Sequence, residues 1–463
     1  MPARALLASI VAMVAVVATG QLAVPPASAL TQTAPGCSGV LGDIDGNGQA
    51  DLVATTYGSD EKKVRPTAQV ILQPSGQQFV LGLVPIISAV AVADVDADGC
   101  ADIISGNQVW FGQPPSIGGG VPDLPQISLP RPSEVDHGMG VVAATPGRIY
   151  TSVFTKSHKL AVLAQTIAAD RSISGSTLLV DPSAPDPRVG DGRGEFGAAL
   201  AAEGNTVLVG SPSRVVNGKS GAGALSVFTA SVASPLAFTS RVYTQNSPGV
   251  PDKTERGDLF AQSLALRDGR VVVGVPGEDL PGDYDQGLVQ LARWDESSRT
   301  MTFGKAVTQN SRGVPGVAEF EDHFGRTVAI GRGITANGSY DAVIGAPDER
   351  VGRKDTAGYV DVVSFDHFKA IGLSQNNSAI PGSAELGDEF GGAITVLPDS
   401  TTDGTPIHDR LAIAARGQST KSTPGTGVVQ VSTGYPVTRS TWVTYHAKPR
   451  DAVDLHFGWQ LAA

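Results

Sequence analysis

Short apolar runs separated by glycine and proline organise this chain, and they recur in a fixed order. Runs of four to eight apolar residues, bounded by turn formers, predict buried strands rather than helices. The stretch from 194 to 228 shows the order in full: Phe196-Gly197, a small-residue strand at 198–201, a Gly204-Asn205 turn, an apolar strand at 206–209, Gly210-Ser211-Pro212, and a strand at 223–228. The pattern therefore predicts three successive strands in this stretch.

The same order returns along the chain at nearly constant spacing. The repeat phenylalanines are 64, 64, 66 and 67 residues apart, at Phe196, Phe260, Phe324, Phe390 and Phe457. A linker with a glutamine-asparagine pair and a Val-Pro or Ile-Pro pair precedes three of them, beginning at Gln245, Gln309 and Gln375. Self-similarity at a fixed period of this kind indicates a repeat architecture.

These repeats resemble the FG-GAP repeat of the integrin α-subunit β-propeller and of many secreted bacterial proteins. The match is carried by Phe196-Gly197, Gly210-Ser211-Pro212, Phe324-Gly325, Gly345-Ala346-Pro347 and Phe390-Gly391. The resemblance implies an all-β fold, a seven-bladed β-propeller of FG-GAP/integrin-α type, as a single domain over residues 30–463. We expect repeats to start near residues 37, 79, 136, 194, 257, 322 and 388, the third of them degenerate.

The two ends of the sequence predict how such a ring closes. Residues 454–463 contain a first strand, from Phe457-Gly458, with no second strand after it, whereas residues 52–55 form a second strand with only a short segment before them. We therefore expect residues 454–463 to pair beside the first repeat and to cover an otherwise open sheet edge. The alternative is that residues 37–41 form the inner strand and that the C-terminal segment packs outside.

Two acidic loops carry the pattern of a hard-cation site. Residues 43–51 and 94–102 place oxygen-bearing side chains at positions 1, 3, 5 and 9 and run directly into strands. Calcium accepts six or more oxygen ligands from such a turn, whereas magnesium requires a more rigid octahedron. Position 12, where an EF-hand has a glutamate, holds Ala54 and Ser105. The alternative is a pair of solvated, aspartate-rich turns.

By resemblance, these loops correspond to the calcium hairpins of FG-GAP and integrin-type repeats, and we expect two Ca²⁺ sites. The expected ligands of the first are Asp43, Asp45, Asn47 and Asp51, with the main-chain carbonyl of Gln49. Those of the second are Asp94, Asp96, Asp98 and Asp102, with the main-chain carbonyl of Cys100.

The N-terminal segment predicts export. Residues 1–29 combine Arg4, an apolar run at 5–17 and Ala27-Ser28-Ala29, as in a secretory signal peptide. We therefore expect a secreted, extracellular protein with no membrane span after cleavage. An oxidising compartment favours a Cys37–Cys100 disulfide over two free thiols. With 34 Lys and Arg against 45 Asp and Glu, the chain has a net charge of −11, which argues against a nucleic-acid partner.

No catalytic motif stands out in the sequence, which has no G-x-S-x-G elbow and no H-E-x-x-H. We therefore expect no catalytic residues and a monomeric, non-catalytic module that binds an extracellular protein or glycan ligand, with adhesion as its role. We expect the ligand on the face opposite the calcium hairpins, at loops 213–222, 277–286 and 348–357. The alternatives are a carbohydrate-binding lectin and a secreted hydrolase with an active site at the propeller mouth.

Overall fold

A computed structural model describes most of the chain after residue 35. The described residues are 36–56, 67–83, 89–114, 123–182, 195–336, 338–367, 369–399, 407–419, 426–447 and 456–463. The expected signal peptide at 1–29 lies outside them. Within these ranges, no segment forms a helix of the length and hydropathy needed to cross a membrane.

The described residues form strands joined by turns and loops. In the first part of the chain these are β1 (Leu52–Thr56), β2 (Thr67–Ile71), β3 (Gln78–Leu83), β4 (Val90–Ala93), β5 (Asp102–Ser105), β6 (Gln108–Trp110), β7 (Gln126–Ser128), β8 (Val135–Thr145), β9 (Arg148–Thr155), β10 (Leu160–Ile167) and β11 (Ile173–Leu179). In the middle they are β12 (Ala199–Glu203), β13 (Thr206–Ser211), β14 (Ala224–Ser231), β15 (Ser234–Tyr243), β16 (Ser263–Arg267), β17 (Arg270–Val275), β18 (Leu288–Asp295) and β19 (Thr300–Val307). The last part contains β20 (Thr327–Arg332), β21 (Tyr340–Ala346), β22 (Tyr359–Ser364), β23 (Ala370–Leu373), β24 (Phe390–Leu397), β25 (Arg410–Ala415), β26 (Val428–Ser432), β27 (Trp442–Tyr445) and β28 (Phe457–Ala462).

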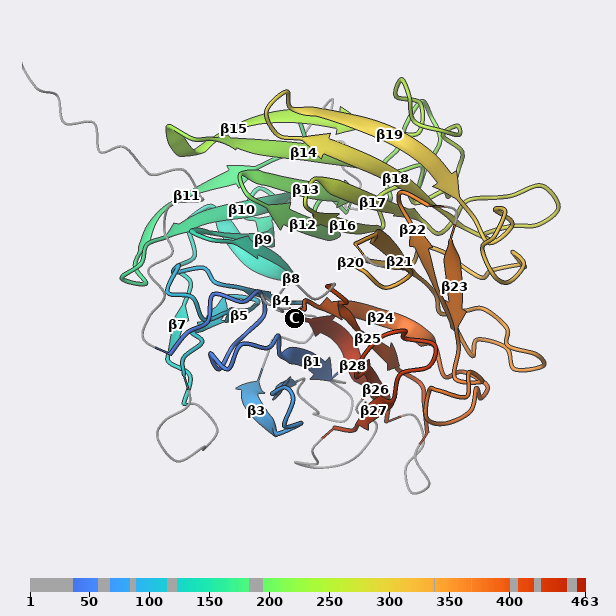
Figure 1. Cartoon of the computed structure of the whole chain (residues 1–463). Helices are drawn as coiled ribbons and strands as arrows, with labels where there is room; N and C mark the ends of the chain where they lie inside the picture. Colours follow the sequence, from blue (N-terminus) through green and yellow to red (C-terminus); the bar gives the residue numbers. More distant parts are fainter. Residues whose placement is uncertain are drawn as a thin grey trace, which may run out of the picture.

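The strands form seven four-stranded antiparallel sheets, which are the blades of a propeller (Figure 1). We number them along the chain: blade 1 is β28-β1-β2-β3, blade 2 is β4–β7, blade 3 is β8–β11, blade 4 is β12–β15, blade 5 is β16–β19, blade 6 is β20–β23 and blade 7 is β24–β27. The predicted all-β, seven-bladed propeller is confirmed. The degenerate third repeat forms a complete blade.

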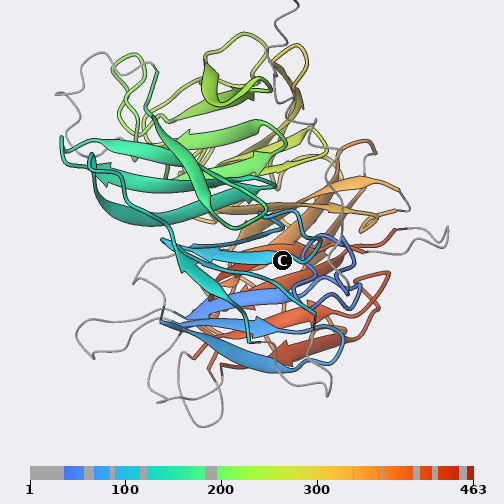
Figure 2. The same cartoon turned by 90° about the vertical axis from the view of Figure 1, so that its left-hand side faces the viewer.

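Blade 1 is shared between the two ends of the described chain. Strand β28 pairs antiparallel with β1, and Val53 lies opposite Ala462. Both views show the blue N-terminal strands beside the red C-terminal ones (Figures 1 and 2). Residue 79, near which the sequence predicts a second repeat, lies instead in β3, because residues 78–83 pair with β2 as the outer strand of blade 1. Blade 2 begins at β4.

The apolar core lies between neighbouring blades, which explains why the second strand of each repeat is a continuous apolar run. In β17 the segment Val271–Val275 is buried throughout, because blade 5 packs against a blade on each of its two faces. One cluster joins Val272 and Val289 of blade 5 to Ile344 of blade 6. A sheet buried on both faces loses the apolar–polar alternation of a half-exposed strand.

From blade 4 to blade 7, the repeat phenylalanine and two repeat glycines join one blade to the next. Phe324 is fully buried, and its amide donates a hydrogen bond to the carbonyl oxygen of Gln286 in the preceding blade. A Cβ on Gly287, whose φ is +83°, would lie 2.3 Å from the carbonyl oxygen of Phe324. A Cβ on Gly274 would lie 2.1 Å from the carbonyl oxygen of Gly325. Only glycine permits these two close approaches between blades.

Candidate metal centre

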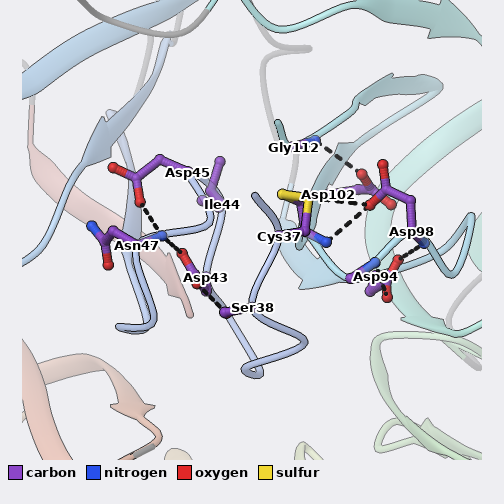
Figure 3. Close-up of a disulfide and its surroundings, with 12 residues drawn as sticks. Cys37, Ser38, Asp43, Ile44, Asp45, Asn47, Asp94, Asp98, Asp102 and Gly112 are labelled. Carbon is purple, nitrogen blue, oxygen red and sulfur yellow. Dashed lines mark hydrogen bonds between the residues drawn. A yellow bond between two sulfur atoms is a disulfide. The ribbon is translucent and has the colours of Figure 1, made fainter. Parts of the chain in front are cut away.

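The first acidic loop brings three carboxylates together directly before β1, and Figure 3 shows two of them, Asp43 and Asp45. Asp43, Asp45 and Asp51 offer oxygen atoms that all lie within 4.8 Å of one another. All three side chains are buried, with exposed fractions of 0%, 6% and 0%. The loop thus concentrates negative charge away from solvent at the beginning of a central strand.

The aspartates also fold the loop, because short acidic side chains accept hydrogen bonds from nearby backbone amides. The Asp51 carboxylate accepts from the amide of Ile44 at 2.9 Å, and the Asp43 carboxylate accepts from the amide of Gly48 at 2.7 Å. The amide of Asn47 donates to Asp43 at 3.1 Å and to Asp45 at 3.2 Å. The expected ligand positions are therefore the positions that build the turn.

Asn47 and Gln49, the two other residues expected at this site, have different surroundings. The Asn47 side-chain amide donates to the carbonyl oxygen of Gln73 at 2.7 Å, and its side-chain oxygen accepts from the amide of Gln49 at 2.9 Å. The Gln49 side chain is exposed. The backbone amide of Gln73 in turn donates to the Asp51 carboxylate at 2.8 Å, so the segment after β2 is bound to the acidic loop at two points.

The second acidic loop repeats this geometry before β5. Asp94, Asp96 and Asp102 again lie within 4.8 Å of one another. The amide of Val95 donates to Asp102 at 2.7 Å, as that of Ile44 does to Asp51. The amide of Gly99 donates to Asp94 at 2.9 Å, as that of Gly48 does to Asp43. The two loops therefore share the same backbone-to-carboxylate hydrogen bonds.

Asp98 and Cys100, also expected at the second site, have other partners. Asp98 lies outside the three-carboxylate cluster, and its carboxylate accepts from the amide of Cys100 at 2.9 Å and from the Arg171 guanidinium at 3.3 Å. Cys100 forms a disulfide with Cys37, with the two Cα atoms 5.0 Å apart. The expected disulfide is confirmed, and it joins the segment before the first loop to the second loop.

The two loops also contact each other through the main chain. The amide of Gly39 donates to the carbonyl oxygen of Gly99 at 2.9 Å, and the amide of Ala101 donates to that of Asp43 at 2.8 Å. Together with the disulfide, these bonds hold the loops of blades 1 and 2 side by side (Figure 3).

Burial makes it costly for these carboxylates to carry charge. Burial, together with the neighbouring carboxylates, raises the pKa of Asp51 to about 8 and that of Asp94 to about 6. The same causes raise the pKa of Asp102 well above its usual range. A divalent cation held among them would favour the ionised form, because an opposite charge within a few ångströms stabilises a carboxylate.

The loops differ in the ion pairs that their carboxylates form with cationic side chains. Among the described residues, no Lys or Arg forms an ion pair with Asp43, Asp45 or Asp51. In the second loop, the Arg171 Nε lies 2.7 Å from Asp96, and its guanidinium lies 4.2 Å from the centre of the Phe111 ring. Arg171 comes from the turn between β10 and β11 in blade 3. The sequence gives no signal for Arg171, because no motif connects this turn with the acidic loop.

The comparisons with known proteins add structural similarity alone. No family model matches the chain, and no curated protein matches it either. Among solved structures, the chain is similar to a protein from Lactobacillus plantarum, with 12% identity, a TM-score of 0.41 and coverage of 89% of this chain and 98% of that one. It is also similar to candidate 6-phosphogluconolactonases from Bacteroides uniformis (11%, TM-score 0.47, coverage 90% and 99%) and Bacteroides fragilis (11%, TM-score 0.48, coverage 90% and 98%).

These names correct the functional expectation. Two of the similar propellers are named as candidate enzymes, so the prediction of a non-catalytic extracellular binding or adhesion module, and with it the prediction that the chain is not an enzyme, is wrong on this comparison. Identities of 11% and TM-scores of 0.47 and 0.48 transfer neither an activity nor a substrate to this chain. The seven-bladed propeller itself rests on the strand pairing.

Proposed function

We propose that this chain is an exported, calcium-binding β-propeller of the FG-GAP type, in which two Ca²⁺ ions stabilise the junction of blades 1 and 2. The observation that carries the proposal is the pair of matching carboxylate clusters, each built from three aspartates within 4.8 Å. Carboxylate oxygens gathered in a tight loop are the ligands that calcium prefers. The FG-GAP repeats and the signal-like segment at 1–29 support the family and the export.

The residues of the first loop fit a divalent cation by charge as well as by type. Asp43, Asp45 and Asp51 would hold the ion, since their buried carboxylates have no cationic side chain paired to them among the described residues. Calcium would supply the compensating positive charge. Asp51 and the Asn47–Gln73 bond then connect the ion site to β1 and to the segment after β2.

In the second loop, Asp94, Asp96 and Asp102 would hold the ion, and Arg171 would contact the site from blade 3. Because the two loops share main-chain hydrogen bonds and a disulfide, an ion in either one would stabilise the same junction. This junction includes the place where the ring closes through β28 and β1.

The test is metal analysis combined with thermal unfolding of the purified chain. We expect two Ca²⁺ per chain, and a lower melting temperature in a chelator, because a ligand bound only to the native state adds about 2.7 kcal/mol at 100 times its Kd. Asp45→Asn and Asp96→Asn should each remove one ion. The control is Asp123→Asn, an exposed aspartate outside both loops. Calcium-free protein whose melting temperature is the same with and without chelator would refute the proposal.

A further inference from the structure

Blades 5 and 6 enclose an apolar groove along their outer edges, remote in the sequence from the acidic loops. The groove has a volume of about 460 Å³ and lies between β18 and β19 on one side and β22 and β23 on the other. Its apolar lining includes Leu291, Phe303, Val314, Val363 and Phe365. Ligand sites in proteins are typically concave, mostly apolar pockets of about 300–1,000 Å³.

The groove is open because the outer strand of blade 6 is short. The outer strands of blades 4 and 5, β15 and β19, contain 10 and 8 residues, whereas β23 contains only 4. Strand β23 begins at Ala370, opposite Val363 of β22, so the strand pairing of blade 6 does not extend to Phe365. The apolar face beyond β23 is therefore left without a covering strand among the described residues.

The rim of this groove is basic, although the chain as a whole is acidic. The described residues that line it include no aspartate or glutamate, in a chain with 45 of them. Its basic residues are all exposed: Arg293, Lys305, Arg312, His367 and Lys369. The Lys369 ammonium donates a hydrogen bond to the carbonyl oxygen of Thr335. Arg293 also pairs with Asp366 at 2.8 Å, at the outer end of the groove. An apolar floor with a positive rim is complementary to a molecule that has an apolar body and an anionic head.

A β-bulge places one of these cations. Phe303 lies opposite Ala292 and Ala306 lies opposite Gln290, so Gly304 and Lys305 together lie opposite Leu291. Such a bulge adds one residue to a strand and changes the direction of its side chains. Lys305 thereby lines the groove beside the linker that contributes Arg312 and Val314.

We propose that this groove binds a fatty-acid anion. Its hydrocarbon chain lies on the floor formed by Leu291, Val363 and Phe365, and its carboxylate is bound at the rim by Lys305 and Arg312. A charge-assisted hydrogen bond from Lys or Arg to a carboxylate is stronger than one between neutral groups, so the head group should contribute to affinity as well as orientation. This inference goes beyond calcium binding and does not depend on it.

The experiment is a calorimetric titration of the full chain with dodecanoate, below the critical micelle concentration and at a fixed calcium concentration low enough to keep calcium dodecanoate in solution. Dodecanol serves as the neutral probe with the same hydrocarbon chain. We expect dodecanoate to bind at least tenfold more tightly than dodecanol. The double variant Lys305→Gln/Arg312→Gln should weaken dodecanoate binding at least tenfold and leave dodecanol binding unchanged. Lys156→Gln, an exposed lysine in blade 3, is the matched control and should change neither.

A second variant tests the floor of the groove. Val314→Trp should fill the groove and abolish binding of both probes, while an unchanged melting temperature shows that the propeller is intact. Equal affinities for dodecanoate and dodecanol would overturn the proposal, as would undiminished dodecanoate binding in the double variant or the absence of binding to the folded wild-type chain. Because every titration contains the same calcium concentration, failure here is separate from failure of the calcium proposal.

Discussion

Glu278 is a buried carboxylic acid whose replacement by glutamine should stabilise the protein above neutral pH. Its side chain is 3% exposed, and it accepts a hydrogen bond from the side-chain amide of Gln245 at 2.7 Å. Burial, reinforced by the nearby Asp252 carboxylate, raises the pKa of Glu278 to about 9. The folded protein therefore holds this side chain protonated and neutral at pH 7.

The repeats themselves contain the neutral counterpart of this group. In blade 5, the amide of Glu278 donates to the carbonyl oxygen of Val275, and the carbonyl oxygen of Glu278 accepts from the amide of Gly287. In blade 7, Gln418 takes the place of Glu278 and makes the same two bonds, to Ala415 and Gly427. Gln375 donates to Gln418 in blade 7 as Gln245 donates to Glu278 in blade 5. A carboxamide has nearly the shape of a protonated carboxylic acid, so glutamine should fit at 278 without repacking.

The magnitude follows from proton linkage. The pKa of Glu278 is higher in the folded state than its unfolded value of 4.5, so the stability from this group is complete below pH 4.5 and is lost as the pH rises toward 9. At roughly 1.4 kcal/mol per pH unit, the loss reaches about 3 kcal/mol at pH 7. Glu278→Gln removes this loss because glutamine does not ionise in either state.

The assay is reversible urea unfolding of wild type and Glu278→Gln at pH 5 and pH 8, with calcium held saturating. We expect the free energy of unfolding of the variant, minus that of wild type, to grow by up to about 4 kcal/mol between the two pH values. Glu134→Gln, at an exposed glutamate, is the control and should show no such growth. A difference for Glu278→Gln that is the same at pH 5 and pH 8 would mean that Glu278 is ionised in the native state, and the reasoning would fail.

Two further predictions concern the closure of the ring. Replacing Cys37 and Cys100 by serine opens a loop of 63 residues and should lower the free energy of unfolding by about 4 kcal/mol on the chain-entropy model. Urea unfolding measures this loss, and equal stability of the variant and the oxidised wild type would contradict it. Deleting residues 456–463 removes β28 and exposes the edge of β1, so the truncated chain should aggregate. Light scattering and calorimetry test this, and a monomer with an unchanged melting temperature would disprove closure by this strand.

The blade repeat could be predicted from the sequence because its causes are local and recur. Each copy must bury an apolar second strand between two neighbouring blades, and each must allow close backbone approach at positions such as Gly274 and Gly287. The first requirement produces a continuous apolar run and the second an unreplaceable glycine. Both are visible in one copy and repeat in the next, so their spacing predicted the fold.

The acidic loops could be predicted for a similar reason, and only in part. Asp43, Asp45 and Asp51 lie within nine residues, so a tight turn necessarily brings them together. Spacing did not distinguish Asp98, which satisfies the same pattern but lies outside the cluster of Asp94, Asp96 and Asp102. Its carboxylate accepts a hydrogen bond from the amide of Cys100, and Arg171 of blade 3 contacts both Asp96 and Asp98.

What only the tertiary structure decided are the contacts between segments that are distant in sequence. Arg171 reaches Asp96 across 75 residues, and the groove of blades 5 and 6 is lined by residues from β18 and β19 of one blade and β22 and β23 of the next. Residues 78–83 complete blade 1 because β2 offers them an unpaired edge. The sequence by itself determined which segments become strands, turns and acidic loops, since these follow from local spacing and burial. Which charges are compensated and which apolar faces stay open depends on how the blades are placed around the ring, and no local pattern records that placement.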